Sequence, residues 1–286
     1  MARRAKGRAA GLRSRRRARR ASSVPHRDEG KECDGGLDFS PGGSCDAVPV
    51  PVLLWIAVAL SAFASGAPLS GDAHQMAAEV LGIDEAGTSP LFAVTHIAAA
   101  LALASVGYPA RRQVPVIATI LGLAGAEAFQ LLSAAVRGSA LTVGVGVLAN
   151  AAMLASTRVA PGTIARGSAL RDGLLGSATL ALSGAPGASP PACALASRAW
   201  SGARRPLESA ALVAIPFELR AAWSAWARAD VPCSGGELAA ACALSLPAAW
   251  VGARGRRLGL ERLVTLAVPW LCVVGASLLA YAWAAR

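Results

Sequence analysis

PLSGDAH, residues 68–74, ends an apolar run that spans residues 51–67 and places an acid and an imidazole two residues apart. Its proline, serine and glycine favour a break in the helix that the apolar run predicts. Main-chain groups freed from a helix at membrane depth need partners, so such a break is tolerated only where it is buried in protein or lines a wet cavity. The stretch therefore marks either a site or a polar loop at headgroup level.

Composition indicates a membrane protein. Of the 286 residues, 54% are hydrophobic and only 16% are charged, and the mean hydropathy is +0.47. A soluble α/β enzyme of this length would carry more charged residues on its surface. It would also seldom offer several apolar windows near the roughly 20 residues that a membrane-spanning helix needs.

The positive net charge lies in the N-terminal tail. Ten of the 28 basic residues fall within residues 1–20, which contain no acid, so 18 basic and 17 acidic residues remain in the rest of the chain. We expect residues 1–48 to be a disordered, Arg-rich N-terminal extension. Residues 49–286 are predicted to form a single membrane domain, for which the tail is an anchor on anionic lipid or has no role. No nucleic-acid partner is expected.

Eight apolar segments are spaced along the chain, at residues 50–67, 91–107, 114–136, 139–156, 172–184, 207–227, 236–252 and 263–284. The first and the fifth are short, and each runs into a Pro/Ser/Gly break followed by a further helix-compatible stretch. Paired breaks of this kind are typical of inverted repeats that meet at a shared site. We therefore expect an all-α polytopic integral membrane protein with two inverted halves, approximately 49–156 and 165–286. Each half would contribute a re-entrant helix-loop-helix hairpin; ordinary interhelical loops are the alternative.

The first break carries groups that could handle a phosphate. Free main-chain N–H groups in a broken helix form a nest for phosphate oxygens, and Ser70 adds a hydroxyl. Asp72 could act as an acid or a nucleophile, and His74 as a general acid near neutral pH. A solvated histidine in a headgroup-level loop is the alternative.

The order of these features resembles the undecaprenyl-diphosphatase family, the bacitracin-resistance membrane phosphatases that recycle the cell-wall lipid carrier. The family motif Pro-x-Ser-Ser-x-Gly-His is similar to the first break, with matches at Pro68, Ser70 and His74. Downstream, a Phe-rich helix with a His-x-Gly-Thr element is similar to LFAVTHIAAALALA, with matches at Phe92 and His96.

The second break is similar to a second motif of that family, Pro-Gly-x-Ser-Arg-Ser-Gly-x-Thr. PGASPPACA matches it at Pro186, Gly187 and Ser189. The resemblance extends in order and spacing over residues 50–284, and the helix LESAALVAIP after the second break also fits. Each motif alone is weak, and their succession along the chain carries the resemblance.

The resemblance implies hydrolysis of a polyprenyl (undecaprenyl) diphosphate to the monophosphate by a multi-pass protein of the bacterial inner membrane. Such a protein serves peptidoglycan biogenesis and antibiotic resistance. A Mg²⁺ or Ca²⁺ cofactor is implied, and a homodimer is a candidate assembly. The catalytic candidates are His74, which matches the motif, and Asp72, which has no family counterpart and could replace a carboxylate. The predicted phosphate-binding residues are Ser70, Gly71, Gly187 and Ser189.

Several functional positions of the family carry other residues in this chain. Two glutamates four apart fall on Ser61 and Ser65, a proposed nucleophilic serine on Gly71, an arginine on Pro190, and a Tyr-Arg pair on Pro269 and Trp270. Serines cannot replace carboxylates at a metal, and the arginine is the clamp for diphosphate charge. The chain is therefore either an active hydrolase or a pseudoenzyme. The alternative function is a non-catalytic lipid-phosphate binder or flippase of the same fold, and a small-solute transporter is a weaker third.

Four further charged residues lie within or beside apolar segments. Glu127 is mid-span with Gln130 one turn along, and an acid inside a membrane is a functional-site candidate because its burial is expensive. A snorkelling charge is the alternative for Glu127. Glu208, Glu218 and Arg220 flank the 207–227 segment and are predicted to be snorkelling or loop-edge charges.

Overall fold

The described part of the chain is helical and contains no strand. The computed structural model describes residues 52–67, 69, 74, 90–132, 139–158, 169–227 and 233–285, which all belong to one compact unit, Val48–Arg286. Its elements are α1 (Val52–Gly66), α3 (Pro90–Gly107), η1 (Tyr108–Gln113), α4 (Val116–Leu132), α5 (Ala140–Ser156), α6 (Ala169–Ala181), η3 (Leu182–Gly184), α7 (Pro190–Trp200), α8 (Pro206–Ala227), α9 (Gly235–Arg254), η4 (Gly255–Leu258) and α10 (Leu260–Ala284). The prediction of an all-α fold is confirmed, and each of the eight apolar segments contains a helix.

Two sequence predictions concern residues that lie outside the described part. The Arg-rich extension, residues 1–48, is one of them. The other is most of the first break, residues 68 and 70–73, together with the helix-compatible stretch that follows it at residues 75–82. Its counterpart after the second break does form a helix, α7.

Among the described residues, three helical stretches are long and apolar enough to cross a membrane: Pro90–Arg112, Gly235–Leu258 and Leu260–Ala284, with 23, 24 and 25 residues. In the last two, only 28% and 33% of the most apolar window is buried inside the protein. The outward faces carry large apolar side chains such as Leu266, Val273 and Trp283. An apolar exterior of this extent is unfavourable in water and favourable in lipid, so these helices indicate a membrane protein.

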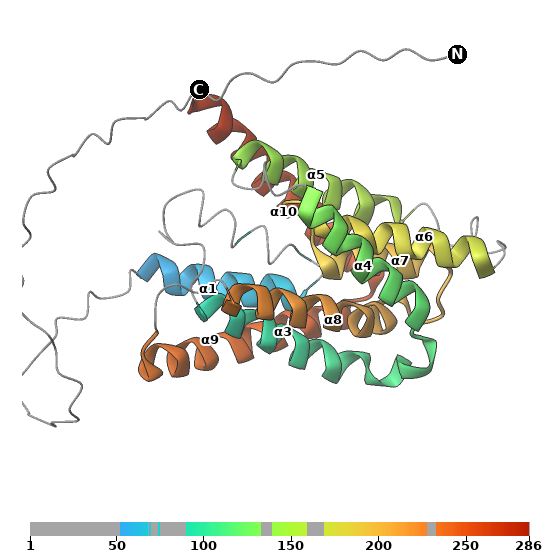
Figure 1. Cartoon of the computed structure of the whole chain (residues 1–286), viewed down its shortest axis with the longest axis horizontal. Coiled ribbons are helices and arrows are strands. Elements are labelled where there is room, and N and C mark those ends of the chain that lie inside the picture. The colour runs from blue at the N-terminus through green and yellow to red at the C-terminus, as the bar shows by residue number, and fades with distance from the viewer. Residues whose placement is uncertain are drawn as a thin grey trace, which may run out of the picture. The chain divides into compact units, whose positions relative to one another are not determined.

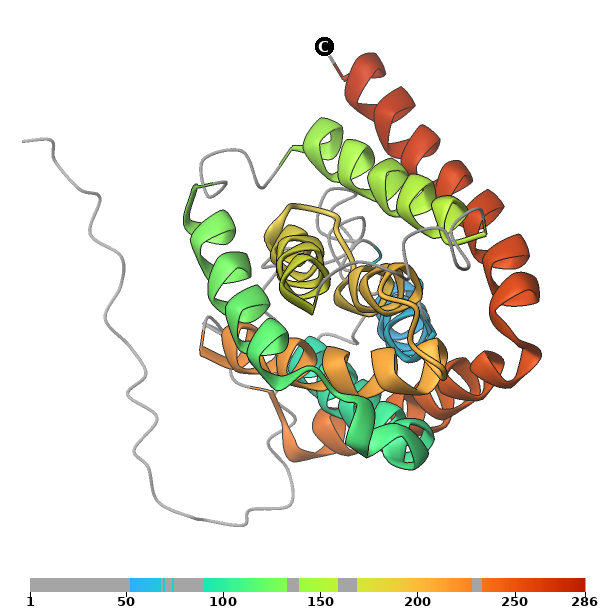
Figure 2. The same cartoon turned by 90° about the vertical axis from the view of Figure 1, so that its right-hand side faces the viewer.

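The helices pack in a few extensive pairs. α3 packs along α8, α5 along α10, α1 along α9, and α4 along α6, while α3 also contacts α9 and α7 contacts α8 (Figure 1). In Figure 2, α1, α6 and α7 are seen nearly end-on, with α3, α4, α5, α8 and α10 arranged around them. In that view the two short helices that precede the sequence breaks, α1 and α6, lie between longer helices, and each also has an exposed face, with side chains such as Leu53 and Leu174.

α1, α3 and α9 run in the same direction. One cluster of buried side chains joins the first halves of these helices and contains Leu54, Val58, Leu91, Phe92 and Ala241. A second cluster joins their second halves and contains Ala62, Ala98, Ala102, Ala249 and Ala253. α8 runs the opposite way beside α3, because Gly107 at the end of α3 lies against Glu208 in the first turn of α8. The end of α1 thus lies at the same end of this group as η4 and the start of α8.

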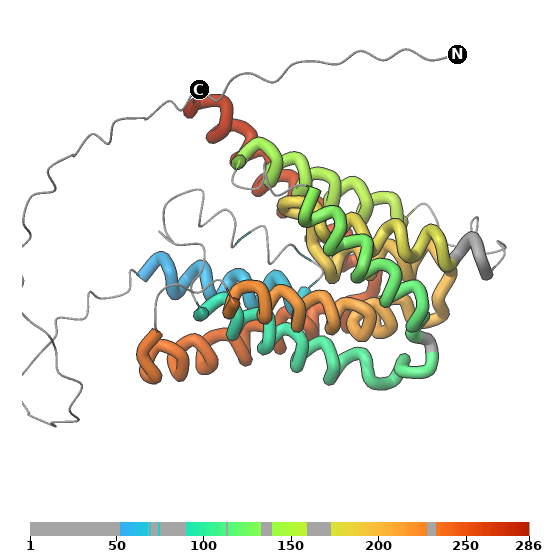
Figure 3. Tube along the Cα trace, in the orientation of Figure 1, coloured from blue at the N-terminus to red at the C-terminus, as the bar shows by residue number. Residues whose placement is uncertain are grey.

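Two glycines in identical tetrapeptides allow close contacts between helices. Ser-Gly-Ala-Pro occurs at residues 65–68 and again at 183–186. A Cβ on Gly66 would overlap the carbonyl oxygen of Ala249 in α9, and a Cβ on Gly184 would overlap the carbonyl oxygen of Ala126 in α4. Small residues allow helix backbones to approach closely in lipid, where packing rather than the hydrophobic effect drives association. Figure 3 shows the path of the chain from α6 through η3 and the second break to α7.

Replacing either glycine should therefore destabilise the protein. We expect Gly66→Ala and Gly184→Ala each to lower the free energy of unfolding by about 1–3 kcal/mol, because the added methyl group forces a backbone shift. Thermal unfolding in detergent, followed by circular dichroism, measures the change. The control is Gly173→Ala in α6, where nothing lies within 4 Å of the added Cβ; it should raise stability by up to about 1 kcal/mol through helix propensity. Equal stability of all three variants would contradict the packing argument.

Candidate functional site

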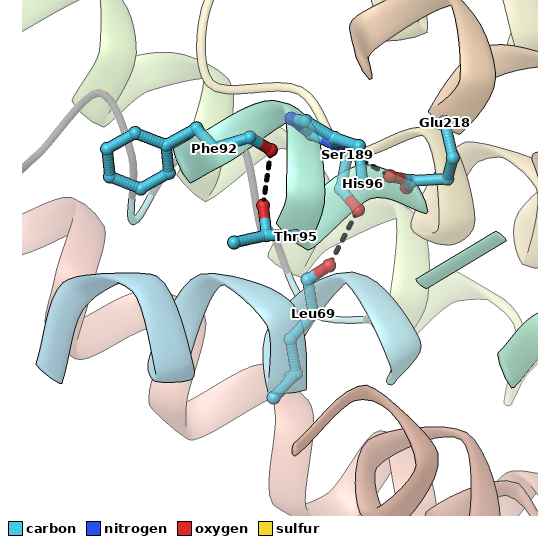
Figure 4. Close-up of polar contacts among 6 residues, drawn as sticks. All are labelled: Leu69, Phe92, Thr95, His96, Ser189 and Glu218. Atoms are coloured by element: carbon cyan, nitrogen blue, oxygen red, sulfur yellow. Dashed lines mark hydrogen bonds and ion pairs between the residues drawn. The ribbon is translucent and has the colours of Figure 1, made fainter. Parts of the chain in front are cut away.

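Ser189 joins the two sequence breaks. It lies at the N-cap of α7 with extended backbone angles (φ −104°, ψ 120°), followed by Pro190, and its hydroxyl oxygen accepts a hydrogen bond from the Ala192 N–H at 3.4 Å. Serine before proline at a helix start is a strong capping pattern. The same hydroxyl donates to the carbonyl oxygen of Leu69 at 2.7 Å, across 120 residues of sequence (Figure 4). The segments after α1 and after α6 therefore meet at this bond.

Asn150 in α5 holds the second break from the other side. Its Nδ2 donates to the carbonyl oxygen of Gly187 at 2.8 Å, and its Oδ1 accepts from the Ser189 N–H at 3.3 Å. Gly187 has a φ of 76°, and a Cβ there would overlap the carbonyl of Val143, so both conformation and space require glycine. Ser189 is one of the predicted phosphate-binding residues of this break. Its main-chain N–H already donates to Asn150, so that N–H is not left over for a phosphate oxygen.

Sequence reasoning missed Asn150. The available signal was an amide within the apolar segment 139–156, where a polar side chain usually bonds to a neighbouring element. Asn150 is fully buried, and its two bonds restrain the loop that carries Ser189.

His96 and Glu218 form a buried pair between α3 and α8. The distance between His96 Nδ1 and Glu218 Oε2 is 2.7 Å, and the two side chains are only 2% and 1% exposed. Figure 4 shows the pair together with Thr95, whose hydroxyl donates to the Phe92 carbonyl at 2.7 Å and so stays within its own helix. A carboxylate and an imidazole in contact can accept, hold and release a proton.

The expectation that Glu218 is a snorkelling or loop-edge charge is wrong. Glu218 lies in the interior of α8, where two of its buried neighbours are Phe217 and Ala214. Glu218 and Arg220 are two residues apart and do not share a helix face, so the local sequence offers Glu218 no partner. The partner that explains its burial, His96, is 122 residues away in the sequence.

Arg256 is a second site of buried charge, and sequence reasoning did not single it out. It lies in η4, is 3% exposed, and donates from Nη1 to the Leu207 carbonyl at 3.0 Å and from Nε to the Gly66 carbonyl at 3.4 Å. It therefore binds the last residue of α1, just before the first break. A run of arginines in sequence gives no signal that one of them points inward.

His74 lies beside Trp270 of α10. Trp270 Nε1 donates to His74 Nε2 at 3.2 Å, and the two rings are nearly parallel with centroids 6.0 Å apart. In this contact the ring nitrogen Nε2 is the acceptor, which fits the tautomer that carries its proton on Nδ1. The other predicted residues of the first break, Ser70, Gly71 and Asp72, lie outside the described residues.

Glu127 forms an ion pair with Arg220 that links α4 to α8. Arg220 Nη2 donates to Glu127 Oε2 at 2.7 Å and also contacts Gln130. The Glu127 side chain is 49% exposed, so this acid lies on the outer face of the bundle. On a face that lipid would cover, an unpaired carboxylate is costly, and the ion pair with Arg220 lowers that cost.

The residues at the positions of the family's glutamates do not fit the implied Mg²⁺ or Ca²⁺. These ions take carboxylate and carbonyl oxygens, whereas Ser61 and Ser65 are buried hydroxyls, and the Ser65 hydroxyl has no hydrogen-bond partner among the described residues. Within the described ranges, no three His, Cys, Asp or Glu side chains gather as a metal site.

Comparison of the chain with protein-family models finds no match, and comparison with curated proteins finds none either.

Removing one member of the buried pair should be costly. We expect Glu218→Ala and His96→Ala each to lower the free energy of unfolding by about 3–5 kcal/mol, because each leaves a buried polar group without its partner. The double variant His96→Ala/Glu218→Ala should lose much less than the sum, since both groups are removed together. Thermal and denaturant unfolding in detergent measure this cycle. Glu208→Ala, at a half-buried acid of the same helix, is the control and should change stability by about 1 kcal/mol or less. Additive losses in the cycle would show that the two residues do not interact.

Proposed function

We propose that this protein acts on a polyprenyl diphosphate lipid carrier in the manner of an undecaprenyl-diphosphatase. The observation that carries the proposal is the hydrogen bond between Ser189 and Leu69. The resemblance rests on two motifs that are far apart in the sequence and must form one site, and this bond joins the two segments that carry them. Two unrelated interhelical loops would have no need to meet inside the bundle.

The packing also supports two inverted halves with re-entrant hairpins. α1 lies against α9 through Gly66, and α6 with η3 lies against α4 through Gly184. If α1, α3, α4 and α5 correspond to α6, α8, α9 and α10, these two contacts are equivalent. Two further large pairs, α3 with α8 and α5 with α10, then join equivalent helices, whereas α3 also packs along α9 and the equivalent pair, α8 with α4, makes little contact. α1 and α6, with 15 and 13 residues, are also shorter than the roughly 20 residues of a spanning helix, as a re-entrant helix requires.

In the proposed reaction, a water oxygen attacks the terminal phosphorus and the bond from that phosphorus to the bridging oxygen breaks. The products are the polyprenyl monophosphate and inorganic phosphate. His74 and Asp72 are the proposed acid/base groups, with Ser70, Gly71, Gly187 and Ser189 around the phosphate. Because the serines in α1 do not fit a divalent cation, no step is assigned to a metal.

A non-catalytic lipid-phosphate binder or flippase is the second candidate. It is favoured by the buried pair of His96 and Glu218, since ionisable pairs inside membrane bundles serve proton relays in transporters. The loss of the family's glutamates and arginine weakens hydrolysis but leaves a lipid-binding site between two halves intact. Both candidates place the protein in a bacterial inner membrane, with a homodimer as the candidate assembly.

The test is phosphate release from undecaprenyl diphosphate by the purified protein in detergent, with and without Mg²⁺ or Ca²⁺. We expect release, and we expect Ser189→Ala to lower its rate about tenfold to a hundredfold because the two segments lose their shared bond and shift relative to each other. Ser105→Ala is the matched control, because within the described part of the chain the Ser105 hydroxyl bonds only to the Ala102 carbonyl of its own helix, at 2.7 Å. Binding of the lipid without phosphate release would support the binder or flippase. Absence of both binding and release would overturn the proposal.

A further inference from the structure

Arg256 differs from its neighbours in the direction of its side chain. Arg254 and Arg257, on either side, are exposed, and the Arg254 guanidinium lies over the Trp250 ring at 3.3 Å from its centroid. Arg256 is instead buried at the junction of η4 with the end of α1 and the start of α8. A turn that follows α9 therefore directs one of three arginines into the protein.

The hydrogen-bonding capacity of this guanidinium is not used up. Its two hydrogen bonds go to the neutral carbonyl groups of Leu207 and Gly66, and Nη2 is buried without a hydrogen-bond partner among the described residues. An unmet donor on a buried charged group is costly. The Nη2 group of Arg256 is therefore left to donate to a further acceptor.

The positive charge also lacks a contacting counter-ion within the described part of the chain. Glu218 and Glu208 act on it only from beyond ion-pair distance, and the Glu218 carboxylate is already bonded to His96. A buried cation without a paired anion is unfavourable unless an anion binds beside it. An anion bound beside Arg256 would supply the counter-charge that the described residues do not provide.

The location connects this arginine to the meeting point of the two breaks. Arg256 binds the carbonyl of Gly66, and Leu69, three residues later, accepts the hydrogen bond from Ser189. The preceding residue, Ser65, also carries a buried hydroxyl that has no partner among the described residues. Two unused donors, one of them charged, therefore lie in or against the last turn of α1.

We propose that Arg256, assisted by the Ser65 hydroxyl, binds the phosphate group at the point where the two breaks meet. In the resembled family, an arginine occupies the position of Pro190. Arg256 would supply the same positive charge from a different element of the fold, η4. Its planar fork suits phosphate oxygens, and the long 3.4 Å contact from Nε to Gly66 is readily exchanged for a charged acceptor. That the phosphate is borne by a lipid rests on the proposed function, whereas the anion site itself does not.

The test compares Arg256→Gln with Arg257→Gln, its exposed neighbour, as matched control. Equilibrium binding and the ligand-dependent rise in unfolding temperature are measured for the full chain in detergent, with undecaprenyl diphosphate and, in a separate arm, inorganic pyrophosphate. We expect Arg256→Gln to weaken binding about tenfold to a hundredfold, the effect of losing a hydrogen bond to a charged group. Arg257→Gln should change it less than about twofold. Equal losses in the two variants, or none in Arg256→Gln, would overturn the proposal.

A second pair of variants decides the matter if Arg256→Gln fails to fold. Ser65 and Ser245 are both buried serines whose hydroxyls have no partner among the described residues, so Ser65→Ala and Ser245→Ala remove no existing hydrogen bond. Ser245 lies in α9 one turn before Ala249, the residue that packs on Gly66. We expect Ser65→Ala to weaken binding about twofold to tenfold and Ser245→Ala to leave it unchanged. Unchanged binding by Ser65→Ala would then overturn the proposal.

The two ligands separate this inference from the proposed function. If the protein binds pyrophosphate through Arg256 but not the lipid, the anion site stands and the proposed function fails. If it binds the lipid equally well with and without Arg256, the proposed function stands and this inference fails. Binding of neither ligand overturns both.

Discussion

Main-chain groups freed inside a membrane bundle must find partners within the protein, and the interior of this molecule is arranged around that requirement. The chain leaves helical geometry after Gly66 and again after Gly184. Three side chains donate hydrogen bonds to carbonyl oxygens at these breaks: Arg256 to Gly66, Ser189 to Leu69, and Asn150 to Gly187. Each of these polar side chains comes from a different element from the backbone it binds, so the breaks and the helices around them stabilise one another.

Polar satisfaction and close packing act together at the two breaks. The glycines of the two Ser-Gly-Ala-Pro segments let α1 and η3 lie directly on the backbones of α9 and α4. Such proximity brings each break near the middle of the bundle, where the hydrogen bonds just described can form. Larger residues would hold the helices apart, and the side chains of Ser189 and Arg256 could not then reach across.

Charge in the interior follows the same logic. His96 and Glu218 are in contact, which reduces the cost of burying each. Glu127 and Arg220 pair on the outer face of the bundle. Arg256 alone of these charged groups has only neutral hydrogen-bond partners in the described part of the chain. The charge that a bound anion would neutralise is therefore located beside the breaks rather than elsewhere in the bundle.

The sequence by itself determined the helices, because apolar segments of fixed length and Pro/Ser/Gly breaks act locally: each of the eight segments contains a helix, and the second break is followed by α7. It also marked Ser189 and His96, which match the family motifs. Only the tertiary structure decided which side chains meet. Glu218 looks like a surface charge until His96, 122 residues away, is placed against it, and Arg256 cannot be told from Arg254 or Arg257 by sequence. Burial and pairing depend on how the helices pack, and that packing brings together residues that no sequence window contains.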